Sequence, residues 1–385
     1  MDNIKGTIAQ VFDEIASGLE TGSFGRRVRV AVTALGSEHG PLEIIRGAEQ
    51  AQAMNSAIEV VVIGGPSGTK LTHVAADSDK EAHEKMDAML ESGELDAAVT
   101  MHYSFPIGVS TVGRVVTPGL GKKMLIANTT GTSDTNRVNA MLKNTISAIA
   151  VAKASGNPDP TVGILNIDGA RQVERTLKKL QENGYPIHFT ESAREDGGVV
   201  MRGNDLLQGV PDIMVMDSLT GNVMTKTLSA FTSGGSYESI GDGYGPGVGE
   251  GYDRIVGILS RASGAPVVAG AIGYIGACAK GGLRDKVNAE FALAKKAGLD
   301  KLMAAIAEAA DGPKAAAEEV KQPPEKVVTE EIPGIEILSL EDAVLVLWKA
   351  SIYATSGMGC TGPVVMVAED DKEKALEILK EADYL

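Results

Sequence analysis

Short runs of β-branched and other apolar residues alternate along this chain with glycine-containing turns and with stretches of helical periodicity. Strands are predicted at Val28–Thr33, Glu59–Ile63, Ala97–Thr100, Met124–Ala127, Thr161–Ile167, Ile213–Met216 and Val267–Ile272. Helices are predicted between them at Gly47–Met54, Glu81–Glu91, Asn136–Ala154 and Arg171–Glu182. Because strands separated by helices pair in parallel rather than as hairpins, the pattern predicts an α/β fold with an open, largely parallel sheet.

Small polar residues and glycines follow several of these predicted strands. The segments are Leu35–Pro41, Asn128–Ser133, Asp168–Gly169 and Asp217–Asn222. Ligands of open α/β sheets bind at strand carboxyl ends, and short polar side chains with uncovered backbone N–H groups hold anions without a metal. Lys226, at the start of a predicted helix, would neutralise a bound phosphate. The alternative is ordinary turn chemistry for the loops and a solvated surface position for the lysine.

The stretch Gly241–Gly251 holds six glycines in eleven residues, and we expect no regular structure there. A loop this rich in glycine is either a lid or close-approach loop over a site, or a floppy connector. The chain has no G-x-x-x-x-G-K-[ST] motif, and no G-x-G-x-x-G motif follows a strand and opens a helix. The usual sequence signals of nucleotide binding are therefore absent.

The composition changes near the C-terminal end. An alanine- and lysine-rich stretch from Asn288 to Glu319 ends at Pro323-Pro324 and is typical of a connector. Beyond it we expect a strand, a helix, a strand and a helix, with Ser339 and Asp342 as a capping pair, at Ile335–Leu338, Leu340–Tyr353, Val364–Ala368 and Lys372–Lys380. The predicted domains are a main α/β region at 1–285, a helical connector at 286–326 and a C-terminal unit at 327–385.

Cys360 lies within this C-terminal unit, in the run SGMGCTGP just before the predicted strand at Val364–Ala368. Flanking glycines let an acyl group and backbone N–H donors approach a thiol closely, whereas the alternative is a small buried hydrophobic residue. Cys278, the other cysteine, lies in an apolar run where burial is expected. The negative end of the preceding helix would raise a thiol pKa, so activation must come from local N–H groups or from His39 or His102.

Composition excludes several classes of function. The chain has 385 residues, and 36 basic against 51 acidic residues give a net charge of −15, which repels nucleic acid. Two cysteines and five scattered histidines predict neither a disulfide framework nor a metal site. The start Met1–Lys5 is unlike a signal peptide, and Gly264–Ala279 is shorter than the ~20 residues of a spanning helix. We expect a cytoplasmic protein without a membrane partner, and we read Gly264–Ala279 as buried sheet and loop.

Three motifs resemble the phosphate acyltransferase family of bacterial phospholipid synthesis. Thr33–Pro41 (TALGSEHGP) is similar to the family's D-A-M-G-G-D-x-x-P opening, and Gly163–Asp168 (GILNID) is similar to its L-N-I-G strand end. Asp212–Thr227 (DIMVMDSLTGNVMTKT) is similar to D-V-x-V-C-D-G-F-T-G-N-V-x-L-K-T. The resemblance implies the open α/β fold shared with phosphate acetyltransferases and isocitrate dehydrogenases. It also implies a reaction in which inorganic phosphate attacks an acyl thioester.

The chain departs from this family at four places. Thr33 replaces the opening aspartate, His102–Ile107 replaces a small-residue loop, Arg171 is a possible substitute for a missing lysine, and the unit with Cys360 is additional. With the runs NTTGTSDTN and SGMGCTGP, the whole chain resembles the alpha subunits of component C of glycine/sarcosine/betaine reductases. That resemblance implies an acyltransferase of amino-acid fermentation, which takes an acetyl group as a cysteine thioester and passes it to phosphate. Implied partners are the component C beta subunit and selenoprotein A.

The resemblance assigns roles that the residues alone leave open. Cys360, Asn222 and His39 are the catalytic candidates. Phosphate-binding candidates are Ser37, Thr129, Thr130, Ser218, Thr220 and Lys226. Inorganic phosphate is expected as a substrate, with no cofactor and no metal, and a homo-oligomer is possible. Two alternatives stay open: a coenzyme-A-dependent phosphate acetyltransferase in which Cys360 only packs, and a noncatalytic scaffold subunit.

Overall fold

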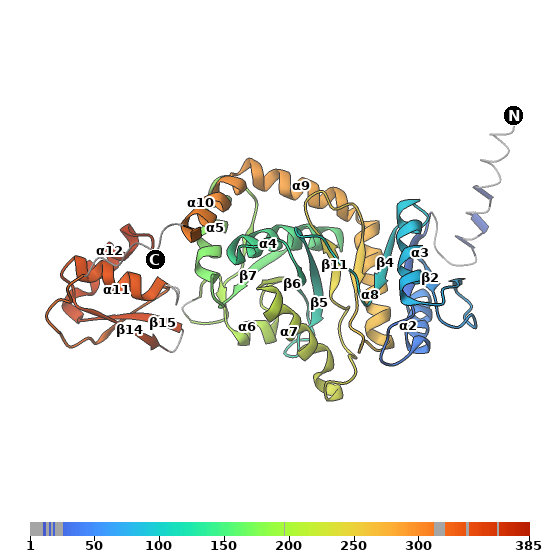
Figure 1. Ribbon diagram of the computed structural model, residues 1–385, viewed down its shortest axis with the longest axis horizontal. Helices are drawn as coiled ribbons and strands as arrows, with labels where there is room; N and C mark the ends of the chain where they lie inside the picture. Colours follow the sequence, from blue (N-terminus) through green and yellow to red (C-terminus); the bar gives the residue numbers. More distant parts are fainter. Residues whose placement is uncertain are drawn as a thin grey trace. The chain divides into compact units, whose positions relative to one another are not determined.

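The computed structural model describes residues 11–12, 15–16, 18–19, 26–195, 197–311, 320–335, 339–359 and 362–385. The chain forms two compact units, of which the first comprises residues 1–165 and 180–299 and the second residues 166–179 and 300–385. The first unit holds a large sheet covered by helices on both faces, and the second holds a small antiparallel sheet (Figure 1).

The large sheet has twelve strands in the order β3-β2-β1-β4-β12-β11-β5-β6-β10-β7-β8, with β9 also paired to β7. Their bounds are β1 Val28–Thr33, β2 Ile58–Ile63, β3 Thr72–Val74, β4 Ala97–Thr100, β5 Val109–Val116, β6 Lys123–Thr132, β7 Thr161–Leu165, β8 His188–Phe189, β9 Val200–Met201, β10 Ile213–Val215, β11 Gly245–Val248 and β12 Val256–Ile258. The central strands are buried on both faces, as expected for a sheet between two helical layers.

The sheet reverses direction at its centre. Strands β1 to β4 and β12 are parallel to one another, and so are β6, β7, β8, β9 and β10. Between the two groups, β11 is antiparallel to both β12 and β5, and β5 is antiparallel to β6. The two parallel groups therefore run in opposite directions, and their carboxyl ends lie at opposite edges of the sheet.

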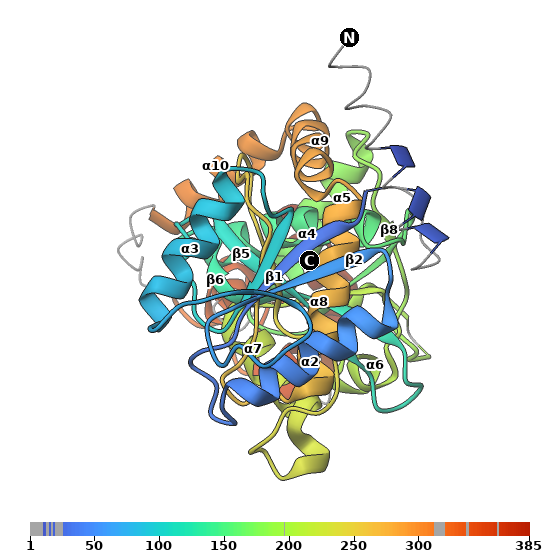
Figure 2. The ribbon, with the colours of Figure 1, turned by 90° about the vertical axis from the view of Figure 1, so that its right-hand side faces the viewer.

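Helices of the first unit are α2 Pro41–Met54, α3 Asp79–Glu91, α4 Arg137–Ala154, α6 Gly203–Gln208, α7 Ser218–Ala230, α8 Ala265–Lys280 and α9 Leu283–Lys296. Helices α4 and α9 lie above the sheet in Figure 1 and α7 lies below it. Helix α2 packs along α8, visible in Figure 2, where Gly47 allows a close crossing because an added Cβ would lie 2.6 Å from Val268 Cβ.

The second unit contains helix α5 up to Lys179, helix α10 from Asp300 on, and the C-terminal fold. Its elements are α5 Ala170–Glu182, α10 Leu299–Asp311, β13 Glu330–Pro333, α11 Leu340–Lys349, β14 Ala354–Gly359, β15 Gly362–Val367 and α12 Lys372–Glu381. Strands β13, β15 and β14 form an antiparallel sheet, and their inner side chains share one hydrophobic core with α11 and α12. This C-terminal part therefore has a core of its own.

Two sequence expectations for the main region are wrong. Val267–Ile272, predicted as a strand within a stretch of sheet and loop, lies in helix α8. A short run of valine, isoleucine, alanine and glycine suits a buried helix as well as a buried strand, so periodicity cannot separate them. Gly241–Gly251, expected to lack regular structure, contains the buried strand β11.

The glycines of β11 are required by close packing between neighbouring strands. A Cβ at Gly245 would lie 1.7 Å from the Val112 carbonyl oxygen, and one at Gly247 would lie 2.3 Å from the Phe105 ring. Only glycine fits at these two positions. The segment is a buried central strand rather than an exposed loop.

The C-terminal expectations are partly confirmed. Helices α11 and α12 and strand β15 form near the predicted places, although α11 ends at Lys349 and not at Tyr353. The expected strand at 335–338 lies mostly outside the described residues, and β13 forms upstream of it. Strand β14 was not expected, because glycines at 357 and 359 disfavour strands. Ser339 is the N-cap residue of α11 but makes no side-chain capping hydrogen bond.

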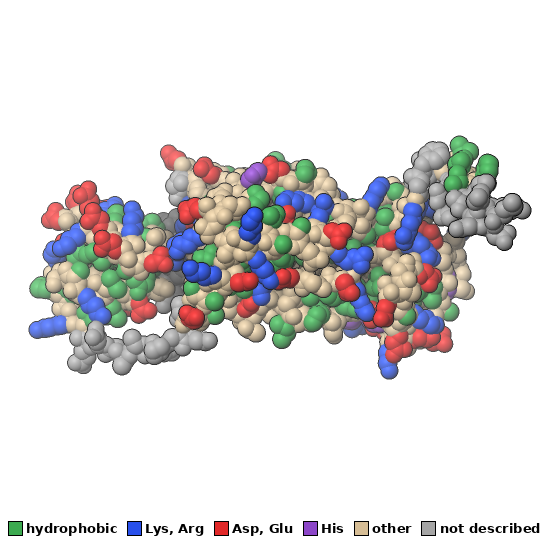
Figure 3. All heavy atoms as spheres, turned by 90° about the horizontal axis from the view of Figure 1, so that it is seen from above, with side chains coloured by type: hydrophobic (Ala, Val, Ile, Leu, Met, Phe, Trp, Pro, Cys, Tyr) green, Lys and Arg blue, Asp and Glu red, His purple; other side chains and the backbone are tan. Residues whose placement is uncertain are grey.

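No single helix in the described part of the chain is long and apolar enough to cross a membrane. Helices α8 and α9 pass the same length and composition test only as a pair, with a bend of 64° between them. On the face in Figure 3, the Lys and Arg side chains of the described residues are interspersed with Asp and Glu.

Replacement of Gly221 by alanine tests the contact that joins α7 to the sheet. An added Cβ at Gly221 would lie 1.7 Å from the Asn128 carbonyl oxygen, so the backbone of α7 or β6 must move. We expect Gly221→Ala to lower the free energy of unfolding by about 2–3 kcal/mol or more, because overpacking a tight contact has costs of this size. Chemical denaturation of the full chain measures the change.

Gly273→Ala is the matched control, because Gly273 also lies inside a helix but has open space around its Cβ position. Alanine there should be neutral or stabilising, by up to about 1 kcal/mol, through its higher helix propensity. Equal effects of the two substitutions would contradict the close approach of α7 to β6.

Candidate functional site

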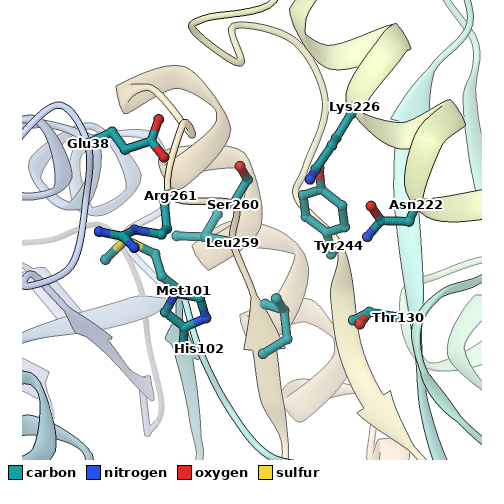
Figure 4. A pocket seen from close by; sticks show the side chains of 11 residues that line it. Glu38, Met101, His102, Thr130, Asn222, Lys226, Tyr244, Leu259, Ser260 and Arg261 are labelled. Atoms are coloured by element: carbon teal, nitrogen blue, oxygen red, sulfur yellow. The ribbon is translucent and has the colours of Figure 1, made fainter. Parts of the chain in front are cut away.

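A pocket of about 290 Å³ opens where the carboxyl ends of β4 and β12 and the loop after β1 face β6 and α7 (Figure 4). It is lined by Glu38, Met101, His102, Thr130, Asn222, Lys226, Tyr244, Ile258, Leu259, Ser260 and Arg261. All of these belong to the first unit. One wall therefore comes from the first parallel group of strands, and the opposite wall comes from the reversed group.

The start of helix α7 is fixed to the sheet by backbone contacts and by its cap. Asp217 is the N-cap residue, and its carboxylate accepts hydrogen bonds from the backbone N–H (3.0 Å) and hydroxyl (2.8 Å) of Thr220 and from Arg137 (3.1 Å). Burial raises the pKa of Asp217, but these hydrogen bonds outweigh it and hold the pKa below its usual value. Gly221 then brings the helix backbone against the Asn128 carbonyl.

Asn222 is the residue after Gly221 in α7, and its side chain points into the pocket (Figure 4). Its Nδ2 donates a hydrogen bond of 3.0 Å to the Thr129 carbonyl oxygen, which fixes the orientation of the amide. An amide has two donor hydrogens and one acceptor oxygen, so one N–H remains for a ligand. Asn222 is therefore a preorganised donor on the α7 wall.

Lys226 lies one turn further along α7 and faces the same pocket. The described part of the chain offers it no carboxylate within ion-pair distance, so its ammonium is available to an anion. Thr130, on β6, completes this wall, with its backbone N–H held by Asn128 Oδ1 at 2.8 Å. The wall thus presents a cation, an amide and a hydroxyl.

Arg261 provides a second cation from the opposite wall. Its Nε donates a hydrogen bond of 3.0 Å to the Gly36 carbonyl, and its own carbonyl accepts one of 2.9 Å from the Glu38 N–H. This reciprocal pair joins the loop after β12 to the loop after β1. The terminal guanidinium nitrogens of Arg261 are left for a ligand, and Arg and Lys facing one pocket favour an anion.

A second cavity of about 590 Å³ adjoins the first and shares Glu38, Lys226 and Ser260 with it. Its remaining lining is Thr227, Ala230, Phe231, Gly234, Gly235, Glu238 and Ala262. Phe231 is 80% exposed at the end of α7, so this cavity has an apolar rim. A small anion in the first pocket would leave room here for a larger group attached to a second reactant.

The structure brings together three of the predicted site residues, Thr130, Asn222 and Lys226, and adds His102, which was considered as an activator of the thiol. Thr129 is fully buried, and its hydroxyl forms hydrogen bonds with Thr111 Oγ1 (2.6 Å) and with the Tyr244 carbonyl oxygen (2.7 Å). We therefore assign Thr129 to the framework of the pocket rather than to its lining.

Four other predicted residues lie outside the pocket lining. Ser37 Oγ accepts a hydrogen bond from the His39 N–H, and the His39 ring packs on Tyr237 with 5.0 Å between centroids. Ser218 is the first residue of α7, and the Thr220 hydroxyl donates a hydrogen bond to the Asp217 carboxylate. Serine and threonine next to a helix start or a turn commonly serve the local backbone, which was the alternative for these loops.

Arg171, considered from the sequence as a substitute cation, pairs with Glu174 at 3.1 Å and lies in the second unit. No group of three or more His, Cys, Asp or Glu side chains with the geometry of a metal site occurs among the described residues.

The two cysteines differ in what the structure describes. Cys278 lies in α8 with none of its surface exposed, as expected, and burial raises its pKa to about 12. Cys360 and Thr361 lie outside the described residues; they connect β14 and β15, whose neighbouring residues Gly359 and Gly362 are paired. The expected effect of the α11 end on the Cys360 thiol therefore also falls outside the described residues.

Sequence reasoning missed Glu38, Arg261 and Ser260 as pocket residues. Glu38 lies within the quoted opening motif, but its role was not considered. Ser260 and Arg261 follow β12, a strand of three residues that was too short and too glycine-rich to recognise. A polar Ser-Arg pair directly after the apolar run Ile255–Leu259 is the signal that would have found them.

Comparison with known proteins gives two kinds of relative. The chain is 55% identical over 99% of its length, and 99% of the relative's, to "Glycine/sarcosine/betaine reductase complex component C subunit alpha" of Peptoclostridium acidaminophilum. It is 26% identical to "Phosphate acyltransferase" of Geobacillus thermodenitrificans, over 52% of this chain and 71% of that protein. A branched-chain phosphotransacylase of Enterococcus faecalis V583 superposes with a TM-score of 0.45 and 16% identity, covering 65% of this chain and 99% of the other.

A family model described as "Fatty acid synthesis protein" matches residues 28–366, which include the strands, helices and loops that form the pocket. The match and the 55% identity over nearly the whole length agree with the resemblance found from the motifs. The chain therefore belongs to the fatty acid synthesis protein family, together with the component C alpha subunits of glycine/sarcosine/betaine reductase complexes.

Proposed function

We propose that the chain is the acyltransferase subunit of a glycine/sarcosine/betaine reductase complex and transfers an acetyl group from a cysteine thioester to inorganic phosphate. The observation that carries the proposal is the pocket in which Lys226 lies on the same helix as the Asn222 amide, with Arg261 on the opposite wall (Figure 4). The 55% identity to a component C alpha subunit supports the complex, and the similarity to phosphate acyltransferases supports the reaction class.

Phosphate is held in this scheme by Lys226 and by the Asn222 and Thr130 side chains, without a metal or a cofactor, and Arg261 adds positive charge from the opposite wall. Arg261 and Asn222 need little reorganisation to bind an anion, because Arg261 is anchored to the Gly36 carbonyl and Asn222 to the Thr129 carbonyl. Fixed donors of this kind position a phosphate oxygen against a carbonyl carbon. They also stabilise the negative charge that collects on the carbonyl oxygen as the oxygen attacks.

The proposed transfer forms one bond and breaks one. A phosphate oxygen forms a bond to the thioester carbonyl carbon, and the carbon–sulfur bond breaks with its electron pair on sulfur. The products are acetyl phosphate and a thiolate, which later accepts a proton from the phosphate hydroxyl through solvent. A thiolate is a good leaving group because the pKa of a free thiol is only about 8.5.

Cys360 is the proposed acetyl carrier. Cys278 is unsuited, because full burial and a pKa of about 12 keep its thiol protonated and out of reach of an acyl donor. Activation of Cys360 is assigned to nearby backbone N–H groups or to His102, which lies in the pocket. His39 is a weaker candidate, since its ring packs on Tyr237.

The proposed partners follow from the relative's name and from the resemblance. They are the component C beta subunit and selenoprotein A, which presents the acetyl donor. The larger adjoining cavity has room for the part of the donor next to its acetyl group. We propose a cytoplasmic location and no nucleic-acid or membrane partner. A net charge of −15 would repel nucleic acid.

Acetylation of the two cysteines is predicted to differ completely. Incubation of the full chain with acetyl phosphate runs the transfer backwards and should add the mass of one acetyl group. Cys360→Ala should abolish the adduct, and Cys278→Ala should retain it, because the Cys278 thiol is fully buried and Cys360 is flanked by glycine in the sequence. Intact-protein mass spectrometry measures both.

An adduct that disappears only in Cys278→Ala would overturn the assignment of the carrier. Acetyl-CoA cleavage by phosphate in a Cys360→Ala chain would favour the coenzyme-A-dependent alternative.

Lys226→Gln should separate the two half-reactions. The acetyl-carrying step should remain, whereas transfer from the acetylated chain to phosphate should slow by about 10²–10³-fold, since one preorganised charge is lost at the reacting anion. Rapid-quench measurement of acetyl phosphate gives the rate. Transfer by the unmodified chain should persist in a chelating buffer, because no metal takes part.

Lys280→Gln is the control, because Lys280 is an exposed lysine at the end of α8 and lies outside the pocket. A slow transfer in both variants would indicate a general effect of charge, and an unchanged rate in Lys226→Gln would remove Lys226 from the site.

A further inference from the structure

Apolar side chains are exposed on helical residues near the start of the chain. Residues 11–12, 15–16 and 18–19 are helical and lie near the N label in Figure 1. Four large apolar side chains among them are exposed to solvent: Val11 (48%), Phe12 (67%), Ile15 (44%) and Leu19 (74%). Single exposed apolar side chains are ordinary on protein surfaces, whereas a contiguous group of them marks an interaction site.

The spacing of these residues places them on one face of a helix. Phe12 and Ile15 are three residues apart, and Ile15 and Leu19 are four residues apart. Side chains at these spacings share one face of an α-helix. In the sequence, Ile4 and Ile8 continue the same spacing upstream. This N-terminal apolar stripe has the pattern of helices that bind in an apolar groove of a partner.

The stripe precedes the part of the chain that matches the family model. That match covers residues 28–366, and every residue of the candidate pocket lies within it. The similarity to the component C alpha subunit of Peptoclostridium acidaminophilum instead covers 99% of this chain, so it includes the stripe. The stripe is therefore not part of the pocket, and it belongs to the length shared with a subunit of a complex.

The charge of this segment favours a groove on another protein over a membrane or a second copy of the chain. Residues 1–22 contain four acidic residues and one lysine: Asp2, Asp13, Glu14, Glu20 and Lys5. Helices that bind anionic membranes carry lysine and arginine on their polar face, so this segment is unsuited to such a surface. A second copy of the chain carries a net charge of −15 and would repel it. An apolar groove with a basic rim complements both the stripe and the acidic residues.

We propose that the N-terminal apolar stripe docks the chain into an apolar groove with a basic rim on the component C beta subunit. This inference rests on the proposed function, because the complex and this partner are proposed there. It goes further by assigning the docking surface to Val11, Phe12, Ile15 and Leu19. Docking buries these four side chains against the groove and brings the acidic residues to its basic rim.

Calorimetric titration of the full chain with the purified component C beta subunit tests the inference. The double substitution Phe12→Ser/Leu19→Ser should weaken binding about 100-fold or more, because truncation of the apolar anchors of an interface removes much of its affinity. The thermal unfolding midpoint should stay unchanged, since both side chains are exposed. Leu42→Ser is the matched control: Leu42 is a leucine of similar exposure (65%) on α2, and its replacement should leave the affinity unchanged.

The outcomes separate this inference from the proposed function. Equal affinity of the double variant and the unmodified chain would overturn the inference and leave the proposed function in place. Absence of binding by the unmodified chain would overturn the inference and the proposed complex together. Stripe-dependent binding by a chain that transfers no acetyl group to phosphate would support the docking surface and contradict the proposed reaction.

Two further measurements on the chain alone test the choice of partner. Size-exclusion chromatography with light scattering should give the same oligomeric state for the unmodified chain and the double variant, and neither should float with vesicles of anionic phospholipid. A dimer, or binding to the vesicles, that is lost in the double variant would overturn the proposal of a beta-subunit groove.

Discussion

The close approach of α7 to β6 is the contact on which the geometry of the pocket depends. Gly221 lies against the Asn128 carbonyl with no space for a side chain, and Asn222 donates to the neighbouring Thr129 carbonyl. These two adjacent contacts fix the rotation of the helix. Lys226, one turn further on, consequently faces the pocket rather than solvent on the far side of α7.

The reversal of strand direction within the sheet explains why loops form one wall of the pocket and a helix forms the other. In a wholly parallel sheet, the loops after every strand would meet at one edge. Here the antiparallel pairings of β11 and β5 reverse the direction of the second group of strands. The carboxyl ends of those strands therefore lie at the opposite edge of the sheet. The first group contributes strand-end loops with Glu38 and Arg261, and the second contributes side chains of helix α7 and Thr130 from within β6.

The sequence predicted the longer parallel strands β1, β2, β4, β6 and β7, the short strand β10 and several of the helices between them, because their hydrophobic patterns are bounded by glycine or polar turns; the short parallel strands β3, β8, β9 and β12 were not predicted. It failed for β11 and α8, where dense glycine and alanine reflect close backbone packing and carry no clear period. Within the site, Asn222 and Lys226 were predicted from a long motif. Arg261 was missed, since its role depends on a contact with Gly36, more than two hundred residues away in the sequence. Loop positions such as Ser218 and Thr220 could not be resolved, because a hydroxyl that binds an anion and one that caps a helix look alike in sequence.

The most direct test of the central claim follows one acetyl group from the protein to phosphate. The full chain is first acetylated and freed of small molecules, and it is then mixed with phosphate that carries oxygen-18. Acetyl phosphate should form in an amount equal to the acetyl group lost from Cys360, with the bridging oxygen derived from the labelled phosphate. Release of the acetyl group as free acetate, or an acetylated chain that does not react with phosphate, would contradict the account.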